Sequence, residues 1–526
     1  MVTSASENSG SDAYDMLVVG SGAAGSLMAA KAAAAGKRVL ILEAGPARNS
    51  EDLINSQLWA RRLKWAGTTV EEEGNLKIGH GFNVGWGTGG SAKHHYAVWP
   101  RLHKGDFKTK TLYDEGIDWP IEYGDLQSFY DKVQNEVGMS GDAAAEIWRP
   151  PGEKYPLPPL PVFAQGKAIQ KGFEALDMNV APIPMAINSQ PYKGRKACMY
   201  DGWCDAGCPI GALANPLVTY LKWALEDGAE LRNDAAVTRI VHDQSGRKVT
   251  GAIYHDADGE ERIVYGDTVV LAAFTVQNAR LLLASASDKH PNGLSNTNDH
   301  VGRYLMTHAS NSVYGLFPED TQPYMGPTGG QLICHDRYKD RHKDEAYGAY
   351  QWLIANALKP NDLLGIANTR PDIYGPALEE FMTKASARMG NMVFVGEDIP
   401  LPENRVELST KRDQYGMPLP KAIHNITAPT EAMCNNAVAE GLAIFKAAGV
   451  REPWQGPRFG MHIMGGTIMG DKPETSVTDS YGRCHELDNL YVTGCGLFPT
   501  SGAVNPTFTI NALTLRTAEH ILDAHA

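Results

Sequence analysis

The chain has 526 residues, enough for two or three domains, and its 43% hydrophobic and 21% charged residues are ordinary for a globular protein. Its 48 Lys and Arg residues against 61 Asp and Glu give a formal charge of −13. No basic run offers a surface that could follow phosphates, which disfavours nucleic acid as a partner. No apolar stretch is long enough to cross a bilayer, so we expect no direct membrane insertion.

The first predicted unit is a strand, a glycine turn, a helix and a second strand over residues 15–45, "DMLVVGSGAAGSLMAAKAAAAGKRVLILEAG". In the GxGxxG pattern, Gly20 allows the tight turn, Gly22 lets the backbone approach a pyrophosphate, and Gly25 permits close packing of helix on strand. Glu43 stands at the end of the second strand, where a carboxylate suits a ribose hydroxyl. The unit therefore predicts a dinucleotide site.

An acidic residue after the second strand argues against a 2′-phosphate, so FAD or NAD fits better than NADP. Residues 79–95 form a second glycine-rich loop, "GHGFNVGWGTGGSAKHH", whose Gly89 and Gly90 could approach a bulky cofactor again. A further predicted strand over 228–237, ending in Val237, returns to the same domain. Two such loops favour FAD, with these residues as further candidates for cofactor contacts.

With these motifs the chain resembles the glucose-methanol-choline (GMC) oxidoreductases, FAD-dependent enzymes that oxidise alcohols. The resemblance also rests on "VVLAAFTVQNARLLLAS", on "VGRYLMTH" at 301–308, and on the C-terminal "HIMGGTIMG…NLYVTGCGLFPTSGAVNPTFTINALTLRTAEHI". Two positions depart from the common pattern: Phe274 stands where most members have Gly, and Gly494 where many have Asp. The narrower pattern is similar to the large subunits of bacterial FAD-dependent glucose, gluconate and fructose dehydrogenases.

The resemblance implies an α/β fold, with a Rossmann-like FAD-binding domain and a discontinuous α+β substrate domain that contains an antiparallel sheet. We expect the FAD-binding domain to combine residues 12–105, 215–310 and 456–526. Residues 106–214 would form a cap or linker region, and 311–455 the substrate-binding domain.

Oxidation of an alcohol by hydride transfer to flavin N5 needs a group that takes the hydroxyl proton and a group that holds the oxygen. A histidine suits the first task. In the resembled family a His is followed about forty residues later by His or Asn, and His462 and Asn505 match those places. We expect His462 to be the base and Asn505 to orient the hydroxyl beside the cofactor; the alternatives are a structural His and a turn cap beside Pro506.

His94 follows the second glycine-rich loop. In some members of the resembled family a His at this place carries a covalent bond to the flavin. Non-covalent FAD, with His94 packing nearby, is the alternative, and the sequence leaves both open.

Three of the seven cysteines, Cys198, Cys204 and Cys208, lie within segment 197–211, whereas the other four are scattered singly. The usual zinc or redox signature, C-x-x-C, is absent. Three thiolates followed by Pro209 are consistent with a 3Fe-4S cluster, and the resembled large subunits hold one with this spacing. Zinc or buried free thiols are the alternatives.

A cluster would take electrons from reduced flavin one at a time and pass them outward. The resemblance then implies a c-type cytochrome subunit as acceptor and a small subunit whose twin-arginine signal carries the large one to the periplasm. The N-terminal "MVTSASENSGSDAYD" has neither a basic n-region nor an apolar h-region, so a cytoplasmic location is the alternative.

The expected reaction is oxidation of a hydroxyl on a sugar, glycoside or sugar acid. A soluble GMC alcohol oxidase or dehydrogenase acting on a non-sugar alcohol without a cluster, or an electron-transfer protein with a vestigial site, are the competing functions.

Overall fold

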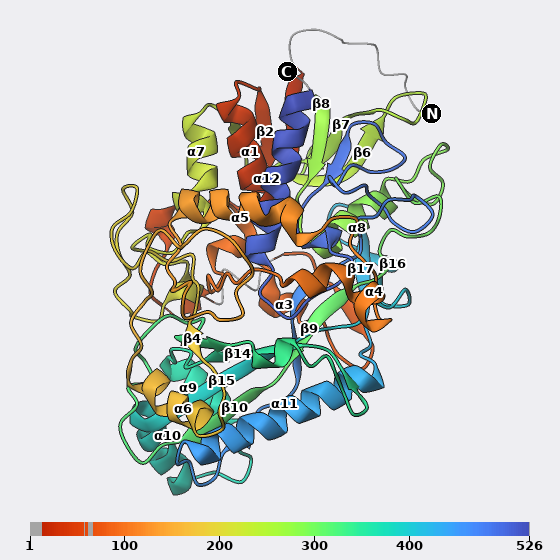
Figure 1. The fold of residues 1–526 in the computed structure, drawn as a ribbon. Helices are drawn as coiled ribbons and strands as arrows, with labels where there is room; N and C mark the ends of the chain where they lie inside the picture. The colour runs from red at the N-terminus through yellow and green to blue at the C-terminus, as the bar shows by residue number, and fades with distance from the viewer. Residues whose placement is uncertain (1–12, 57, 61–66, 525–526) are drawn as a thin grey trace.

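The computed structural model describes residues 13–56, 58–60 and 67–524. Two large sheets lie at opposite ends of the molecule, with long connecting segments between them (Figure 1).

The sheet at the top of Figure 1 grows from the predicted strand–helix–strand unit. Its central strands are parallel and almost wholly buried, because helices or loops cover both faces. The order is β5-β2-β1-β8-β7-β6, with β20 also pairing β8, and β7 pairs antiparallel with both β8 and β6. The strands are β1 (Tyr14–Val19), β2 (Val39–Leu42), β5 (Glu230–Arg232), β6 (Ala236–His242), β7 (Val249–His255), β8 (Glu261–Leu271) and β20 (Leu490–Val492).

Helix α1 (Ala23–Ala34) follows the glycine turn and packs against α7 (Tyr220–Glu226) and α12 (Thr507–Ala524). Its alanines are buried almost all round, and such small side chains allow three helices to approach closely. Helix α5 (Tyr123–Val137) packs on the other side of α12, and α8 (Thr275–Ala284) follows β8.

The second sheet, at the bottom of Figure 1, is antiparallel, in the order β18-β10-β15-β14-β11-β4, with β9 joining β15 to β19. Helix α11 (Ala428–Ala447) runs beneath β10 and β15 and packs against α6 (Ala164–Glu174). The strands are β4 (Ala181–Pro182), β9 (Met306–Ser310), β10 (Ser312–Leu316), β11 (Leu332–Cys334), β14 (Tyr350–Ile354), β15 (Met389–Gly396), β18 (Trp454–Gln455) and β19 (Phe459–Met464).

Smaller elements complete the fold. Strands β16 (Arg405–Arg412), β17 (Pro418–Ile423) and β3 (Glu71–Glu73) form a third sheet, and β12 (His342–Lys343) pairs with β13 (Ala346–Tyr347). Further α-helices are α3 (His80–Asn83), α4 (Thr109–Tyr113), α9 (Pro360–Ala367) and α10 (Pro376–Arg388).

The expected fold class, an α/β nucleotide domain with a second domain built on an antiparallel sheet, is confirmed. The first sheet draws its strands from the ranges 12–105, 215–310 and 456–526, although β9 and β19, which lie in two of those ranges, pair within the second sheet. Strand β4, from the range 106–214, also joins the second sheet, as do most strands of 311–455.

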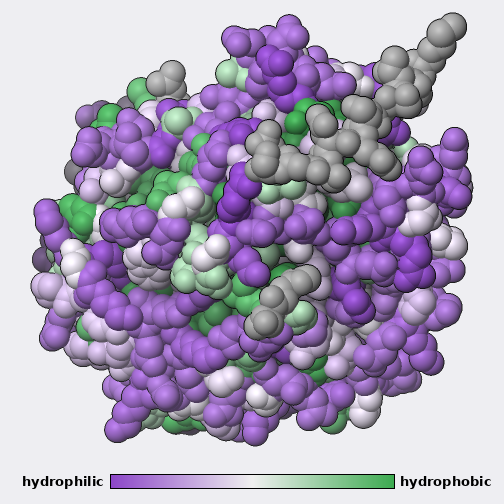
Figure 2. Space-filling model, turned by 90° about the horizontal axis from the view of Figure 1, so that it is seen from above, coloured by the Kyte–Doolittle hydropathy of each residue, from purple (hydrophilic) through white to green (hydrophobic). Residues whose placement is uncertain are grey.

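Within the described residues, no helix combines the length and apolar character needed to cross a membrane. Seen from above, hydrophilic residues make up most of the surface, and hydrophobic ones show in smaller patches between them (Figure 2).

Candidate active site

A cavity of about 680 Å³ extends from the glycine turn of the first sheet to the second sheet. Gly20, Gly22 and Glu43 line it at one end, and Tyr314 and Val393 of the antiparallel sheet line it at the other. His462 and Asn505 lie on its wall as well. The cavity thus joins the predicted dinucleotide site to the predicted catalytic pair.

The three glycines of the first motif have different surroundings. A Cβ on Gly20, whose φ is 103°, would lie 2.5 Å from the carbonyl oxygen of Ala272, and one on Gly25 would lie 1.9 Å from that of Gly20. Neither position admits a side chain. A Cβ on Gly22 would meet nothing within 4 Å because this glycine faces the cavity. Bare backbone at the N-terminus of α1 is therefore open to a ligand, as binding of a pyrophosphate requires.

A hydrogen-bond network joins the two glycine-rich loops. The Glu43 carboxylate accepts bonds from the backbone N–H and the hydroxyl of Ser21, at 3.1 and 2.6 Å, and the Ser21 hydroxyl accepts from the backbone N–H of Gly89 at 2.9 Å. Gly90 lines the cavity beside Gly22, whereas Gly89 and Gly25 lie behind its wall. The donor and acceptor groups around this end suit a nucleotide.

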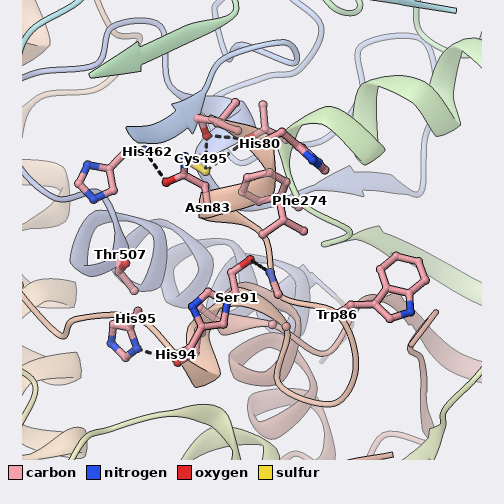
Figure 3. Close-up of a pocket in the computed structure, with 18 of the residues that line it drawn as sticks. His80, Asn83, Trp86, Ser91, His94, His95, Phe274, His462, Cys495 and Thr507 are labelled. Atoms are coloured by element: carbon pink, nitrogen blue, oxygen red, sulfur yellow. Dashed lines mark hydrogen bonds between the residues drawn. The ribbon is translucent and has the colours of Figure 1, made fainter. Parts of the chain in front are cut away.

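Further residues of the predicted cofactor site lie along the same cavity. Val237 and His94 line it, and Figure 3 places His94 and His95 together in the lower part of the view, with His462 in the upper part. Burial lowers the pKa of His95 to about 4. Phe274 also lines the cavity, with φ 77° and ψ 155°, a conformation that glycine adopts far more easily.

His462 lies in β19 at an irregularity of the strand. Its φ is 60°, and the pairing with β9 shifts register between Met461 and Ile463. The backbone N–H of His462 donates to Oδ1 of Asn83 at 3.1 Å, the dashed contact in Figure 3. This bulge turns the imidazole out of the sheet and toward the cavity.

The hydrogen bonds of His308, in β9, fix the tautomer of His462. Nε2 of His308 lies 3.0 Å from the carbonyl oxygen of Gly502, which can only accept, so Nε2 carries the proton. Nδ1 of neutral His308 is then an acceptor, and it lies 2.9 Å from Nδ1 of His462. His462 must donate from Nδ1, which leaves a lone pair on its Nε2.

That Nε2 lies 3.2 Å from Nδ2 of Asn505. Burial, and secondarily the neighbouring His308, holds the pKa of His462 well below its usual range, and burial lowers that of His308 to about 4. Both rings are therefore neutral at physiological pH. A neutral imidazole nitrogen beside an amide N–H can take the proton of a hydroxyl while the amide N–H donates to its oxygen.

The three clustered thiols lie in a tightly wound segment with positive φ at Tyr200 and Cys208 as well as at its glycines. Each sulfur accepts a backbone N–H: Cys198 from Tyr200 at 3.3 Å, Cys204 from Thr328 at 3.5 Å, and Cys208 from Leu213 at 3.4 Å.

Burial, with a smaller contribution from the neighbouring thiols, raises the pKa of Cys198 and of Cys204 to about 12. Across the described ranges, no three His, Cys, Asp or Glu side chains are arranged to hold a metal ion. An iron–sulfur cluster would take thiolates as its ligands, and each of these three sulfurs already accepts a backbone N–H. This donor set fits such a cluster.

The thiol segment borders the cavity. Asp205, next to Cys204, lines it, and so does Thr328, whose hydroxyl donates to the carbonyl of Gly202 at 2.8 Å. The Lys359 ammonium donates to the same carbonyl at 2.9 Å. Because its backbone N–H also bonds the Cys204 sulfur, Thr328 connects that thiol to the cavity wall.

Sequence reasoning missed several of these residues. Ser21 lies inside the first glycine motif and His308 ends the motif "VGRYLMTH", so both were within reach of a motif argument. No sequence motif pointed to Asn83, because its contact with His462 spans a separation of 379 residues.

Comparison with known proteins gives the same family for both parts of the chain. Two GMC oxidoreductase family models match residues 14–310 and 400–514. Fructose dehydrogenase large subunit from Gluconobacter japonicus is 29% identical, over 97% of this chain and 98% of the relative. 2-Methyl-1,2-propanediol dehydrogenase from Mycolicibacterium austroafricanum is 30% identical, over 97% and 95%.

Among solved structures, pyridoxine 4-oxidase from Mesorbium loti has the same fold, with a TM-score of 0.65 at 17% identity over 97% of this chain and 99% of that one. The resemblance seen in the motifs is thereby confirmed. The chain belongs to the GMC oxidoreductase family, and it is a FAD-dependent enzyme that acts on CH–OH groups.

Proposed function

We propose that this protein is a dehydrogenase that oxidises a hydroxyl of a sugar, glycoside or sugar acid, with His462 as the base. Cys198, Cys204 and Cys208 would hold a 3Fe-4S cluster, which would supply one-electron transfer away from the flavin. The observation that carries the proposal is the position of His462 on the cavity wall, with its Nε2 3.2 Å from Nδ2 of Asn505 and its Nδ1 2.9 Å from Nδ1 of His308.

The chain's own part in the reaction follows from these two side chains. The substrate hydroxyl donates its proton to Nε2 of His462, and the oxygen accepts a hydrogen bond from Nδ2 of Asn505. His462 keeps its Nδ1–H on His308 throughout, so the ring does not rotate when it becomes charged. Bound FAD supplies the hydride acceptor at its N5.

The residues that would hold FAD are Gly20, Gly22, Gly25, Glu43, Gly89, Gly90, His94, Val237 and Asn505. Gly22 supports this proposal most directly, because the space at its missing side chain opens into the cavity. Ser21 would support the ribose end by keeping the Glu43 carboxylate in place.

The cluster would accept electrons singly from the flavin and release them singly to the next carrier. The three thiols must lose their protons to bind iron, and the backbone N–H bonds to sulfur would stabilise the thiolate charge. Their position behind the cavity wall at Thr328 and Asp205 suits a carrier next to the flavin.

We infer a c-type cytochrome subunit as acceptor and a small signal-bearing subunit that carries this chain to the periplasm. The support is the similarity to a protein named as the large subunit of a fructose dehydrogenase. A cytoplasmic location is the alternative.

A second candidate function is oxidation of a non-sugar alcohol without a cluster. The 30% identity to 2-methyl-1,2-propanediol dehydrogenase favours it. The cavity wall supports it too, because Leu353, Val393 and Phe459 at the second sheet are apolar.

The test is anaerobic reduction of the enzyme-bound flavin by D-fructose, D-glucose, D-gluconate and 2-methyl-1,2-propanediol, followed by reoxidation with dioxygen or cytochrome c. Bleaching by a sugar or sugar acid and reoxidation by cytochrome c alone are expected. Bleaching by the diol alone, or fast reoxidation by dioxygen, would favour the second function.

A separate test asks whether His94 holds FAD covalently. Acid precipitation of the same protein answers it: covalent flavin stays with the precipitate, and non-covalent flavin is released.

A further inference from the structure

The hydrogen bonds of the catalytic pair continue into the second sheet. Oδ1 of Asn505 accepts from Nε2 of Gln351, in β14, at 3.0 Å. Oε1 of Gln351 lies 2.9 Å from Nε2 of His335, and Nδ1 of His335 lies 3.0 Å from Nε2 of His103. Gln351 has no exposed surface and His335 has 5%. Nothing in the reaction described above uses these three residues.

The series has a fixed direction because it begins at a backbone carbonyl. The carbonyl of Gly502 can only accept, so Nε2 of neutral His308 carries the proton and its Nδ1 accepts from Nδ1 of His462. Nε2 of His462 then has a lone pair and accepts from Nδ2 of Asn505.

Every later bond then has one possible direction. Because Nδ2 of Asn505 faces His462, Oδ1 of Asn505 faces Gln351 and accepts from its Nε2. The oxygen of the Gln351 amide accepts from Nε2 of neutral His335. Nδ1 of His335 is then an acceptor, so Nε2 of His103 donates to it. The series from Gly502 to His103 has one polarity.

We propose that Gln351, His335 and His103 are positioning residues that hold the Asn505 amide with its N–H toward His462 and so keep Nε2 of His462 a proton acceptor. The inference rests on the proposed function, in which His462 is the base. It adds a reason for the orientation of the pair that neither residue supplies alone, since an amide can present its nitrogen or its oxygen to a neighbour.

The surroundings keep these imidazoles neutral. Burial lowers the pKa of His335 and of His103 to about 3. The charged groups nearby are Arg341, which is bound between Asp106 and Glu397, and Asp336, which accepts from Trp148 at 2.7 Å. Tyr338 stacks on His103 at a ring separation of 3.8 Å. A proton added to Nδ1 of His335 would set a donor against Nε2–H of His103 and break that bond of the series.

The direct test is Gln351→Glu, which keeps the shape of the side chain. An ionised carboxylate cannot donate to Asn505, so the amide turns its oxygen to His462 and stabilises a proton on Nε2. A protonated carboxyl can still donate. Reduction of the flavin by the substrate found above is therefore expected to fall about a hundredfold as pH rises and the introduced carboxyl ionises, whereas the parent shows no such fall.

A second readout does not depend on turnover. In oxidised holoenzyme labelled with ¹⁵N-histidine, the ring-nitrogen shifts distinguish the two tautomers, and His462→Asn identifies the signals of that ring. The parent should show the Nδ1–H form, and Gln351→Glu at high pH the Nε2–H form. If the parent is reduced by none of the substrates, the proposed function fails, but this spectrum still tests the positioning series.

Two further variants separate positioning from packing. His335→Gln can donate to Gln351 and accept from His103, so it should retain most of the parent rate, whereas His335→Leu should not. Gln331→Glu is the matched control, because Gln331 is a buried glutamine outside the series whose amide bonds Phe163 and Met325. The proposal is contradicted if Gln351→Glu keeps the parent's pH profile and tautomer, or if Gln331→Glu changes the profile equally.

Discussion

The imidazoles of His308 and His462 face each other through their Nδ1 atoms, 2.9 Å apart, with their planes at 86°. Only one of the two nitrogens can carry a proton when both rings are neutral. The carbonyl of Gly502 assigns that proton to His462 and leaves Nε2 of His462, the proposed base nitrogen, free. The proposed chemistry of the site therefore depends on His308, a histidine whose motif gave no catalytic signal.

Replacing His462 should stop the chemical step while leaving the cofactor site intact. His462→Ala removes the base and is expected to slow substrate reduction of the flavin by about 10² to 10⁴-fold, with FAD still bound. Stopped-flow absorbance under anaerobic conditions measures the rate. In the parent, the lowered pKa of His462 predicts a rate that is constant at neutral pH and falls only in acid well below pH 6.5. A variant that is as fast as the parent would refute the assignment.

His308 should affect the rate through the tautomer alone. His308→Leu removes the acceptor for Nδ1–H of His462, which allows the proton to move to Nε2, and we expect a loss of about tenfold or more in flavin reduction. His308→Gln keeps an acceptor oxygen and should recover part of the rate. Equal rates in both variants would show that His308 only fills space.

The glycines of the first motif should separate folding from cofactor binding. Gly25→Ala places a methyl against the carbonyl of Gly20, so it should lower stability by about 1–3 kcal/mol or more. Gly22→Ala meets no protein atom and should leave the melting temperature of FAD-free protein unchanged, yet weaken FAD binding. Thermal melts and flavin titrations measure the two effects. Equal FAD affinity in Gly22→Ala and the parent would count against a pyrophosphate at this turn.

Acid should destabilise the protein through its buried histidines. Burial lowers the pKa of His80 from 6.5 to about 4, so the unfolded chain binds a proton that the folded chain does not bind between those values. Stability from this group is therefore present above pH 6.5 and is lost as pH falls toward 4. In His80→Gln, the unfolding free energy should fall less steeply over that interval, by up to about 1.4 kcal/mol per pH unit. Denaturant titrations at several pH values test this, and parallel curves would contradict it.

The strand–helix–strand unit could be predicted from the sequence because its signals are local: the glycine spacing, the buried β-branched strands and Glu43 all fall within residues 15–45. His462 and Asn505 could be named as candidates because family motifs surround them. The series from Asn505 to His103 could not be found, since Gln351 meets Asn505 across 154 residues and His103 meets His335 across 232. The bulge at His462 had no local signal either, because it depends on the register between β19 and β9.

The measurement that tests the central claim most directly is the iron and acid-labile sulfide content per FAD of protein purified without oxygen, together with its low-temperature EPR spectrum. We predict a near-stoichiometric 3Fe-4S signal that is lost in Cys204→Ser and kept in Cys434→Ser, a matched change at a buried single cysteine. FAD without iron or sulfide in the parent would contradict an electron-exporting dehydrogenase and leave the three thiols a structural role.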